Sequence, residues 1–127
     1  MRVTRYLAVH DAGRLMNPLT ATSQIKGAVT QGLSMALHED LLYDRRSGQP
    51  LTAGYYGARI ATHRDVPEIE VMFIENDDGY GPYGAKSIGE SGILPAPAVV
   101  ANAVFNAIGR RVKDLPLTRD RILGVLA

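Results

Sequence analysis

The 127-residue sequence predicts an α/β protein of the α+β kind, with a mixed sheet of antiparallel strands packed by two main helices and a short C-terminal helix. Two stretches alternate apolar and polar residues, as half-buried strands do. Two longer stretches repeat apolar residues at three- and four-residue steps, which is the helical period. Hydrophobic residues make up 46% of the chain and charged residues 21%, a composition typical of one globular domain with one core.

The first predicted strand covers residues 3–10, where apolar and polar side chains alternate. It begins almost at Met1, which leads us to expect a chain that starts inside a larger structure. Residues 11–13, Asp-Ala-Gly, predict a turn, and Asn17-Pro18 predicts a second break.

Residues 20–42 predict the first long helix. Gly27 and Gly32 lie inside it, and each costs about 1 kcal/mol relative to alanine. Two such glycines suggest that something packs closely against this helix, and both a helix–sheet contact and the approach of a ligand remain open. The candidates for its N-cap are Thr20, Thr22 and Ser23. The expected buried residues are Ile25, Ala28 or Val29, Leu33, Ala36 and Leu37.

The middle of the chain predicts a hairpin and a second strand. Residues 41–52 are typical of a hairpin with a solvated tip at 45–48. Residues 54–62 show no clear period, whereas residues 68–75 alternate and predict a strand. Residues 76–79, Asn-Asp-Asp-Gly, predict a turn.

Residues 81–92 hold four glycines together with Lys86, Ser87 and Glu90, and we call this segment the glycine loop. Glycine lets a backbone approach a ligand closely, and a glycine-rich loop before a helix often holds an anion on free N–H groups. Glu90 is its only acid. The loop is therefore the strongest candidate for chemistry in this chain.

Two helices are predicted after the glycine loop. The first begins near Pro97 and ends at Ile108, with Gly109 as its C-terminal cap. Thr118 is the expected cap of a short last helix that ends at Leu126. The expected buried face of the first is Val99, Val100, Ala103, Val104 and Ala107.

Composition excludes several classes of protein. The net charge of +1 favours neither a nucleic-acid partner nor an anionic membrane surface. The absence of cysteine excludes disulfides, iron–sulfur ligation and a cysteine nucleophile. No apolar run reaches the roughly 18 residues that a membrane-spanning helix needs, so no membrane partner is expected.

Three catalytic or metal motifs are weak. A triphosphate-binding loop would need lysine directly after glycine, but Ala85 stands before Lys86, and Pro82 removes an N–H. Ser91 lacks the Gly-x-Ser-x-Gly frame of a hydrolase nucleophile. The histidines do not have the spacing of metal ligands and are expected at the surface, with no metal held directly by side chains; they are His10, His38 and His63.

Gln24 and Glu90 each have two interpretations from the residues alone. Gln24 could hydrogen-bond a heterocycle or be a solvated side chain. Glu90 could act as the chemical group of the loop or cap the following helix, because acids are favoured at helix N-termini.

Four segments, in order along the chain, resemble the C-terminal part of the molybdopterin-binding large subunit of the xanthine dehydrogenase/aldehyde oxidase family. The resemblance covers nearly the whole chain with its motif spacings kept, and the bacterial form, with a molybdopterin cytosine dinucleotide cofactor and separate iron–sulfur and flavin subunits, is the most similar. The segments are 10–18 (HDAGRLMNP), 24–33 (QIKGAVTQGL), 65–71 (DVPEIEV) and 84–90 (GAKSIGE).

The resemblance implies that residues 1–127 are the C-terminal portion of a molybdopterin cofactor-binding domain. It implies that Glu90 is the active-site base, which makes a water-derived oxygen nucleophilic toward an aldehyde or an N-heteroaromatic substrate. It also implies that Gln24 contacts the pterin and that the Lys86 side chain and nearby N–H groups face anionic parts of the cofactor. The implied cofactor-lining residues are Lys86, Ser87, Ile88 and Gly89, with a second loop of Gly13, Arg14, Leu15 and Met16.

The chain departs from the family pattern in sequence and in length. The mild departures are Ser23, Ala28, Ala61 and Ser87. Family subunits run to several hundred residues, so the chain is expected to be a fragment that needs the remainder of the large subunit. Alone, it is expected to hold no cofactor and to have no turnover. The alternative is a non-catalytic module that binds a partner or forms a homo-oligomer, with an exposed apolar patch on residues 20–42. Cytoplasmic and periplasmic locations both stay open.

Overall fold

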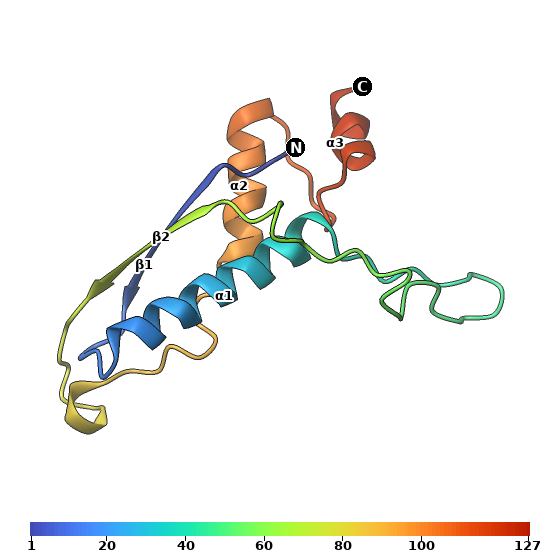
Figure 1. Cartoon of the computed structure of the whole chain (residues 1–127). Helices are drawn as coiled ribbons and strands as arrows, with labels where there is room; N and C mark the ends of the chain where they lie inside the picture. Colours follow the sequence, from blue (N-terminus) through green and yellow to red (C-terminus); the bar gives the residue numbers. More distant parts are fainter.

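Strands β1 (Arg5–Asp11) and β2 (Glu68–Ile74) form a two-stranded parallel sheet in the computed structural model, which describes residues 1–127. The expectation of antiparallel strands was therefore wrong. A hairpin joins antiparallel neighbours, whereas parallel strands need a long crossover. Here the crossover contains a whole helix, α1 (Pro18–Leu37), which lies alongside the sheet (Figure 1). The mixed helix-and-strand character of the fold is confirmed.

Helix α1 begins two residues before the predicted start and ends five residues before the predicted end. Asn17 is its N-cap, because the Asn17 side chain accepts hydrogen bonds from the N–H groups of Leu19 and Thr20, both at 3.1 Å. Pro18 fits the first helical position, where no N–H is needed. The Asn17-Pro18 break is thus the helix start itself.

Helices α2 (Ala96–Ile108) and α3 (Arg119–Leu126) confirm the two helices predicted after the glycine loop. Gly109 caps α2 in the left-handed conformation, with φ +69°. The buried side of α2 is narrower than expected, because the helix packs on α1 along a stripe of four-residue steps. This stripe is Ala96, Val100 and Val104, whereas the expected residues Val99, Ala103 and Ala107 are exposed.

The core lies between the sheet, α1 and α2. Ile25 and Val29 of α1 are fully buried, and burial of one such side chain stabilises a fold by about 1.5–3 kcal/mol. The remaining buried apolar residues are mainly Tyr6, Ala8, Leu33, Ala36, Ile69, Val100, Val104, Val112 and Leu117. The apolar face of α1 is thus covered, and of its large apolar side chains only Leu19 and Met35 are exposed.

Residues 39–60 extend away from the body of the protein (Figure 1). Within this segment, Asp44 N–H donates to Gln49 O at 2.8 Å and Leu51 N–H to Leu42 O at 2.7 Å. These bonds confirm the predicted hairpin, although only one bridge, Tyr43 to Pro50, is formed. No helix is both long enough and apolar enough to cross a lipid bilayer.

Candidate functional site

Two loops that are far apart in the sequence meet at the end of β1. Arg14 N–H donates to Gly84 O at 2.8 Å, and Lys86 N–H donates to Ala12 O at 3.0 Å. These bonds surround an isolated antiparallel bridge between Gly13 and Ala85. The meeting brings the 13–16 loop against the glycine loop, as the predicted pair of cofactor-side loops requires.

Gly13 allows this close contact. Its φ of +58° lies in the left-handed region, which side-chain-bearing residues rarely adopt. A Cβ atom added here would overlap the carbonyl oxygen of Gly84. The junction between the two loops therefore needs glycine at this position for two separate reasons.

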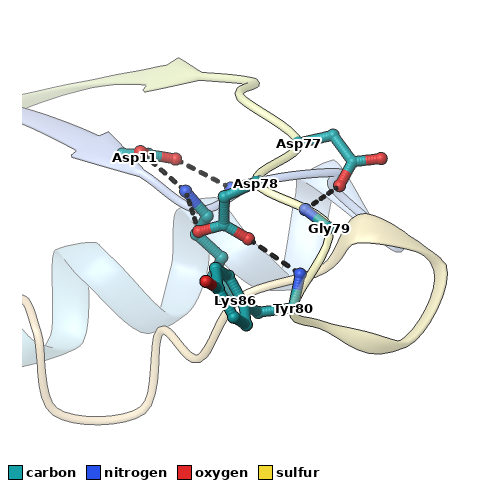
Figure 2. Close-up of polar contacts among 7 residues, drawn as sticks. Asp11, Asp77, Asp78, Gly79, Tyr80 and Lys86 are labelled. Carbon is teal, nitrogen blue, oxygen red and sulfur yellow. Dashed lines mark hydrogen bonds and ion pairs between the residues drawn. The ribbon is translucent and has the colours of Figure 1, made fainter.

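The Lys86 ammonium lies between two carboxylates, as Figure 2 shows. Its Nζ is 2.9 Å from Asp11 Oδ2 and 3.0 Å from Asp78 Oδ2. The hydrogen bond from Lys86 lowers the pKa of Asp11 and of Asp78, and the same two bonds raise the pKa of Lys86. The side chain expected to face an anionic cofactor is thus directed at aspartates.

Gln24 holds the far end of the glycine loop. From the second turn of α1, its Nε2 donates to the carbonyl oxygen of Gly89 at 2.6 Å. Gly89 directly precedes Glu90, so this bond fixes the peptide beside the candidate base. Gln24 is therefore neither a free solvated side chain nor fully available to a heterocycle.

The Gln24–Gly89 contact is shared by two neighbouring hollows. One has a volume of about 530 Å³ and includes Glu90. The other has a volume of about 450 Å³ and includes the residues expected on the second cofactor loop. The first is lined by Thr20, Ser23, Gln24, Gly27, Ala28, Gln31, Gly89, Glu90 and Ile93. The second is lined by Ala12, Arg14, Leu15, Met16, Asn17, Thr20, Ala21, Gln24, Ala85, Lys86, Ile88 and Gly89.

Glu90 is exposed at the edge of the first hollow. It does not cap α2, which begins at Ala96 after the N-cap Pro95 and has no side-chain cap bond. The helix-cap interpretation is therefore wrong, and the Glu90 carboxylate is left without a structural role in the helix.

The glycines of α1 separate the two explanations that the sequence left open. At Gly32, a Cβ atom would lie 2.5 Å from the Ala96 Cβ, so this glycine permits the contact with α2. A Cβ at Gly27 would meet nothing within 4 Å, and Gly27 lines the hollow beside Glu90. Close helix packing thus explains Gly32, and an open surface surrounds Gly27.

The residues of the glycine loop fit a polar, anionic group such as a pterin cofactor. The backbone N–H groups of residues 87–92 donate to no acceptor in the chain. The Ser91 hydroxyl oxygen, next to Glu90, is buried without a hydrogen-bond partner. Free donors of this kind are what an anion-binding loop presents, and a buried polar atom without a partner is costly.

The other candidates from the sequence form no site. No group of three or more His, Cys, Asp or Glu side chains could hold a metal ion. The Ser91 hydroxyl contacts no base, since it has no hydrogen-bond partner at all. Residues 82–84 form one short 3-10 turn, and Lys86 is engaged by aspartates, which agrees with rejecting a triphosphate-binding loop.

The two loops predicted to lie on the cofactor side do meet in the structure, but the role of the two aspartates was not predicted. Asp11 and Asp78 were assigned only to turns, and their side chains hold Lys86 across 75 residues of sequence in the case of Asp11. The available signal was that Lys86 is the one cation of the glycine loop and that two acid-containing turns, residues 11–13 and 76–79, precede it. Which acid would reach it depends on how β1 and β2 pair.

The sequence of this chain is similar to those of known molybdenum-binding proteins. Residues 1–67 match the family model of a molybdopterin cofactor-binding domain. The chain is 44% identical over 127 residues to the aldehyde oxidoreductase molybdenum-binding subunit PaoC of Escherichia coli, covering 99% of this chain and 17% of that protein. It is 37% identical over 120 residues to an Escherichia coli xanthine dehydrogenase molybdenum-binding subunit, covering 94% and 16%.

A solved structure agrees with the fold. The crystal structure of quinoline 2-oxidoreductase from Pseudomonas putida 86 superposes with a TM-score of 0.90 at 34% sequence identity. The match covers 98% of this chain and 16% of the quinoline enzyme chain. The chain thus spans about one sixth of the length of the proteins it matches.

Proposed function

The chain belongs to the molybdenum-binding subunits of the xanthine dehydrogenase/aldehyde oxidase family, and from this we propose that residues 1–127 form one wall of a molybdopterin site. We place it in the C-terminal portion of the cofactor-binding domain. The full enzyme would oxidise an aldehyde or an N-heteroaromatic compound with oxygen from water. The observation that carries the proposal is the meeting of the glycine loop with the 13–16 loop, together with an exposed Glu90 at the other end of the glycine loop.

Glu90 is the proposed base. Oxidation of an aldehyde by water yields a carboxylic acid, two protons and two electrons, so a proton acceptor is needed next to the attacking oxygen. The two-electron oxidation would be supplied by a bound molybdopterin cofactor with its molybdenum. The Glu90 carboxylate would accept a proton from the attacking oxygen, because an ionised carboxylate can act as a general base.

The remaining residues bind and orient. The free N–H groups of residues 87–90 would donate to the cofactor, and Arg14, Leu15 and Met16 would line its opposite side. Gln24 keeps the Gly89 carbonyl in place and thereby orients Glu90. Its remaining amide hydrogen and its oxygen could still meet the pterin.

The assembly follows from the names and lengths of the relatives. Both Escherichia coli relatives are named as subunits, and this chain spans 17% and 16% of them. We therefore propose the remainder of a large subunit and separate iron–sulfur and flavin subunits as partners. The proposed form of the cofactor is molybdopterin cytosine dinucleotide.

The test is Glu90→Gln in a full-length subunit that contains this chain. The variant keeps the size of the side chain and removes the proton acceptor, so turnover of aldehydes and purines should fall by at least about 100-fold. Molybdenum and pterin content, measured by metal analysis and cofactor extraction, should stay unchanged.

Glu75→Gln is the matched control, because Glu75 is exposed just after β2 and contacts neither hollow. It should leave turnover unchanged. Full turnover in Glu90→Gln with normal molybdenum content would overturn the role of Glu90 as base.

A further inference from the structure

We propose that Lys86 is a positioning residue, whose ammonium is clamped between Asp11 and Asp78 to hold the glycine loop, rather than a ligand for the anionic parts of a cofactor. This inference rests on the proposed function, because the purpose of the clamp is to orient Glu90. It differs from the role implied for Lys86 by family resemblance.

The first argument is the number of donors. An ammonium has three N–H groups, and two are directed at Asp11 Oδ2 and Asp78 Oδ2 at 2.9 and 3.0 Å. The Lys86 side chain is also the more buried member of both pairs, at 22% exposed against 41% and 40%. Lys86 is thus held inside the junction, with its carboxylate partners nearer to water.

The second argument is the local charge. The single ammonium is paired with two carboxylates, while the neighbouring Asp77 side chain lies against Gly84, where an added Cβ would be 3.0 Å from Asp77 Oδ2. Figure 2 shows Asp77 and Asp78 in the same turn, with Oδ1 of each accepting an N–H, from Gly79 and Tyr80 respectively. Two carboxylates paired with one ammonium leave a net negative charge at this cluster. An anionic group would be repelled there rather than attracted.

Arg14 is the cation that remains for an anion in the same hollow. It lines the hollow with Lys86, its side chain is exposed, and it forms no ion pair. The two cations therefore have different roles. Arg14 can face a ligand, while Lys86 neutralises part of the acidic turn.

The third argument is the position of the clamp along the loop. Lys86 is held through its side chain and through its N–H bond to Ala12, and Gly89 is held by Gln24. Only Ser87 and Ile88 lie between these two fixed points, and Glu90 follows the second. Loss of the side-chain clamp would leave only the backbone bond at the first point, so the segment and the Glu90 carboxylate would gain freedom to move.

The experiment compares Lys86→Met, Lys86→Arg, Asp11→Asn and Asp78→Asn in the full-length subunit. Hydrogen exchange by mass spectrometry on the cofactor-free subunit does not depend on turnover. It reports on peptides covering residues 84–90, in which the hydrogen-bonded N–H groups of residues 84–86 carry the protection. Lys86→Met should raise exchange in these peptides several-fold, since it removes both ion pairs. Lys86→Arg keeps the charge and should restore most of the protection.

The double variant Asp11→Asn with Lys86→Met distinguishes an aspartate–lysine clamp from side chains that act independently. If Lys86 acts through the aspartates, Asp11→Asn should add little exchange in the Lys86→Met background. The loaded enzyme should then show a lower kcat with molybdenum largely retained, whereas Arg14→Met should chiefly lower cofactor content. Asp78→Asn is the milder variant, because one pair to Lys86 survives, and it keeps the test informative if Lys86→Met folds poorly.

Two results would overturn the inference. One is loss of cofactor in Lys86→Met with unchanged exchange over residues 84–90, which would make Lys86 a ligand. The other is full additivity of Asp11→Asn and Lys86→Met. Neither result bears on whether Glu90 is the base, which the turnover of Glu90→Gln decides separately.

Discussion

Gly13 is the residue on which the contact between the two loops depends most directly. Gly13→Ala would force a side chain into the left-handed region and drive its Cβ against the Gly84 carbonyl. Strain of this kind costs about 1–3 kcal/mol. We expect the free energy of unfolding to fall by that amount, measured by denaturant titration, with faster hydrogen exchange in residues 84–90.

The control is Gly27→Ala. Gly27 lies within α1 at an ordinary helical conformation, and its added Cβ meets nothing within 4 Å. Alanine is favoured over glycine in a helix interior by about 1 kcal/mol, so this variant should stabilise the chain. Equal destabilisation by both substitutions would contradict the special role of Gly13.

At the residue scale, the sequence identified candidates but not their partners. Glu90 was recognisable because it is the only acid in the glycine loop, and the position of α2 then removed its helix-cap interpretation. The partners of Lys86 were not recognisable. Asp11 ends β1 and Asp78 lies in the turn after β2, and only the parallel pairing of these strands brings both to one lysine.

At the scale of elements, the start of α1 sets the position of Gln24 and therefore of the glycine loop. Asn17→Ala removes the acceptor for two N–H groups at the helix start. Loss of such a cap costs about 1 kcal/mol. We expect that loss in the free energy of unfolding, whereas Ser23→Ala should change little, because Ser23 is exposed and makes no side-chain hydrogen bond within the chain. An equal loss in both variants would contradict the assignment of the cap.

The existence and order of α1, α2 and α3 were predictable, because the helical period is visible in each segment of sequence on its own. The direction of the sheet was not. Period-two alternation is the same in parallel and antiparallel strands, and the distinction lies in what connects them. The segment between β1 and β2 contains both a helix and a hairpin, and the predicted hairpin favoured antiparallel pairing although it joins neither strand.

At the scale of the whole molecule, the sheet is covered on one face only. Its inner face packs on the core, while Leu7, Val9, Met72 and Ile74 on the other face are each about half exposed, between 50% and 57%. Parallel sheets are usually buried on both faces. This open face and the span of about one sixth of its relatives agree with a chain that acts together with further protein.

The last prediction concerns the 127-residue chain on its own. The first hollow is bounded by one face of α1 and the glycine loop, and the second by α1 and the two loops that meet. The residues proposed to touch the cofactor, Gln24, Glu90 and Arg14, are exposed. A ligand bound there would keep much of its surface in water, which limits the free energy of binding. We expect the purified chain to contain no molybdenum and to show no aldehyde or purine oxidation. Metal analysis by mass spectrometry decides this: near-stoichiometric molybdenum would mean that these residues alone complete the site, and the proposed need for the rest of the large subunit would be wrong.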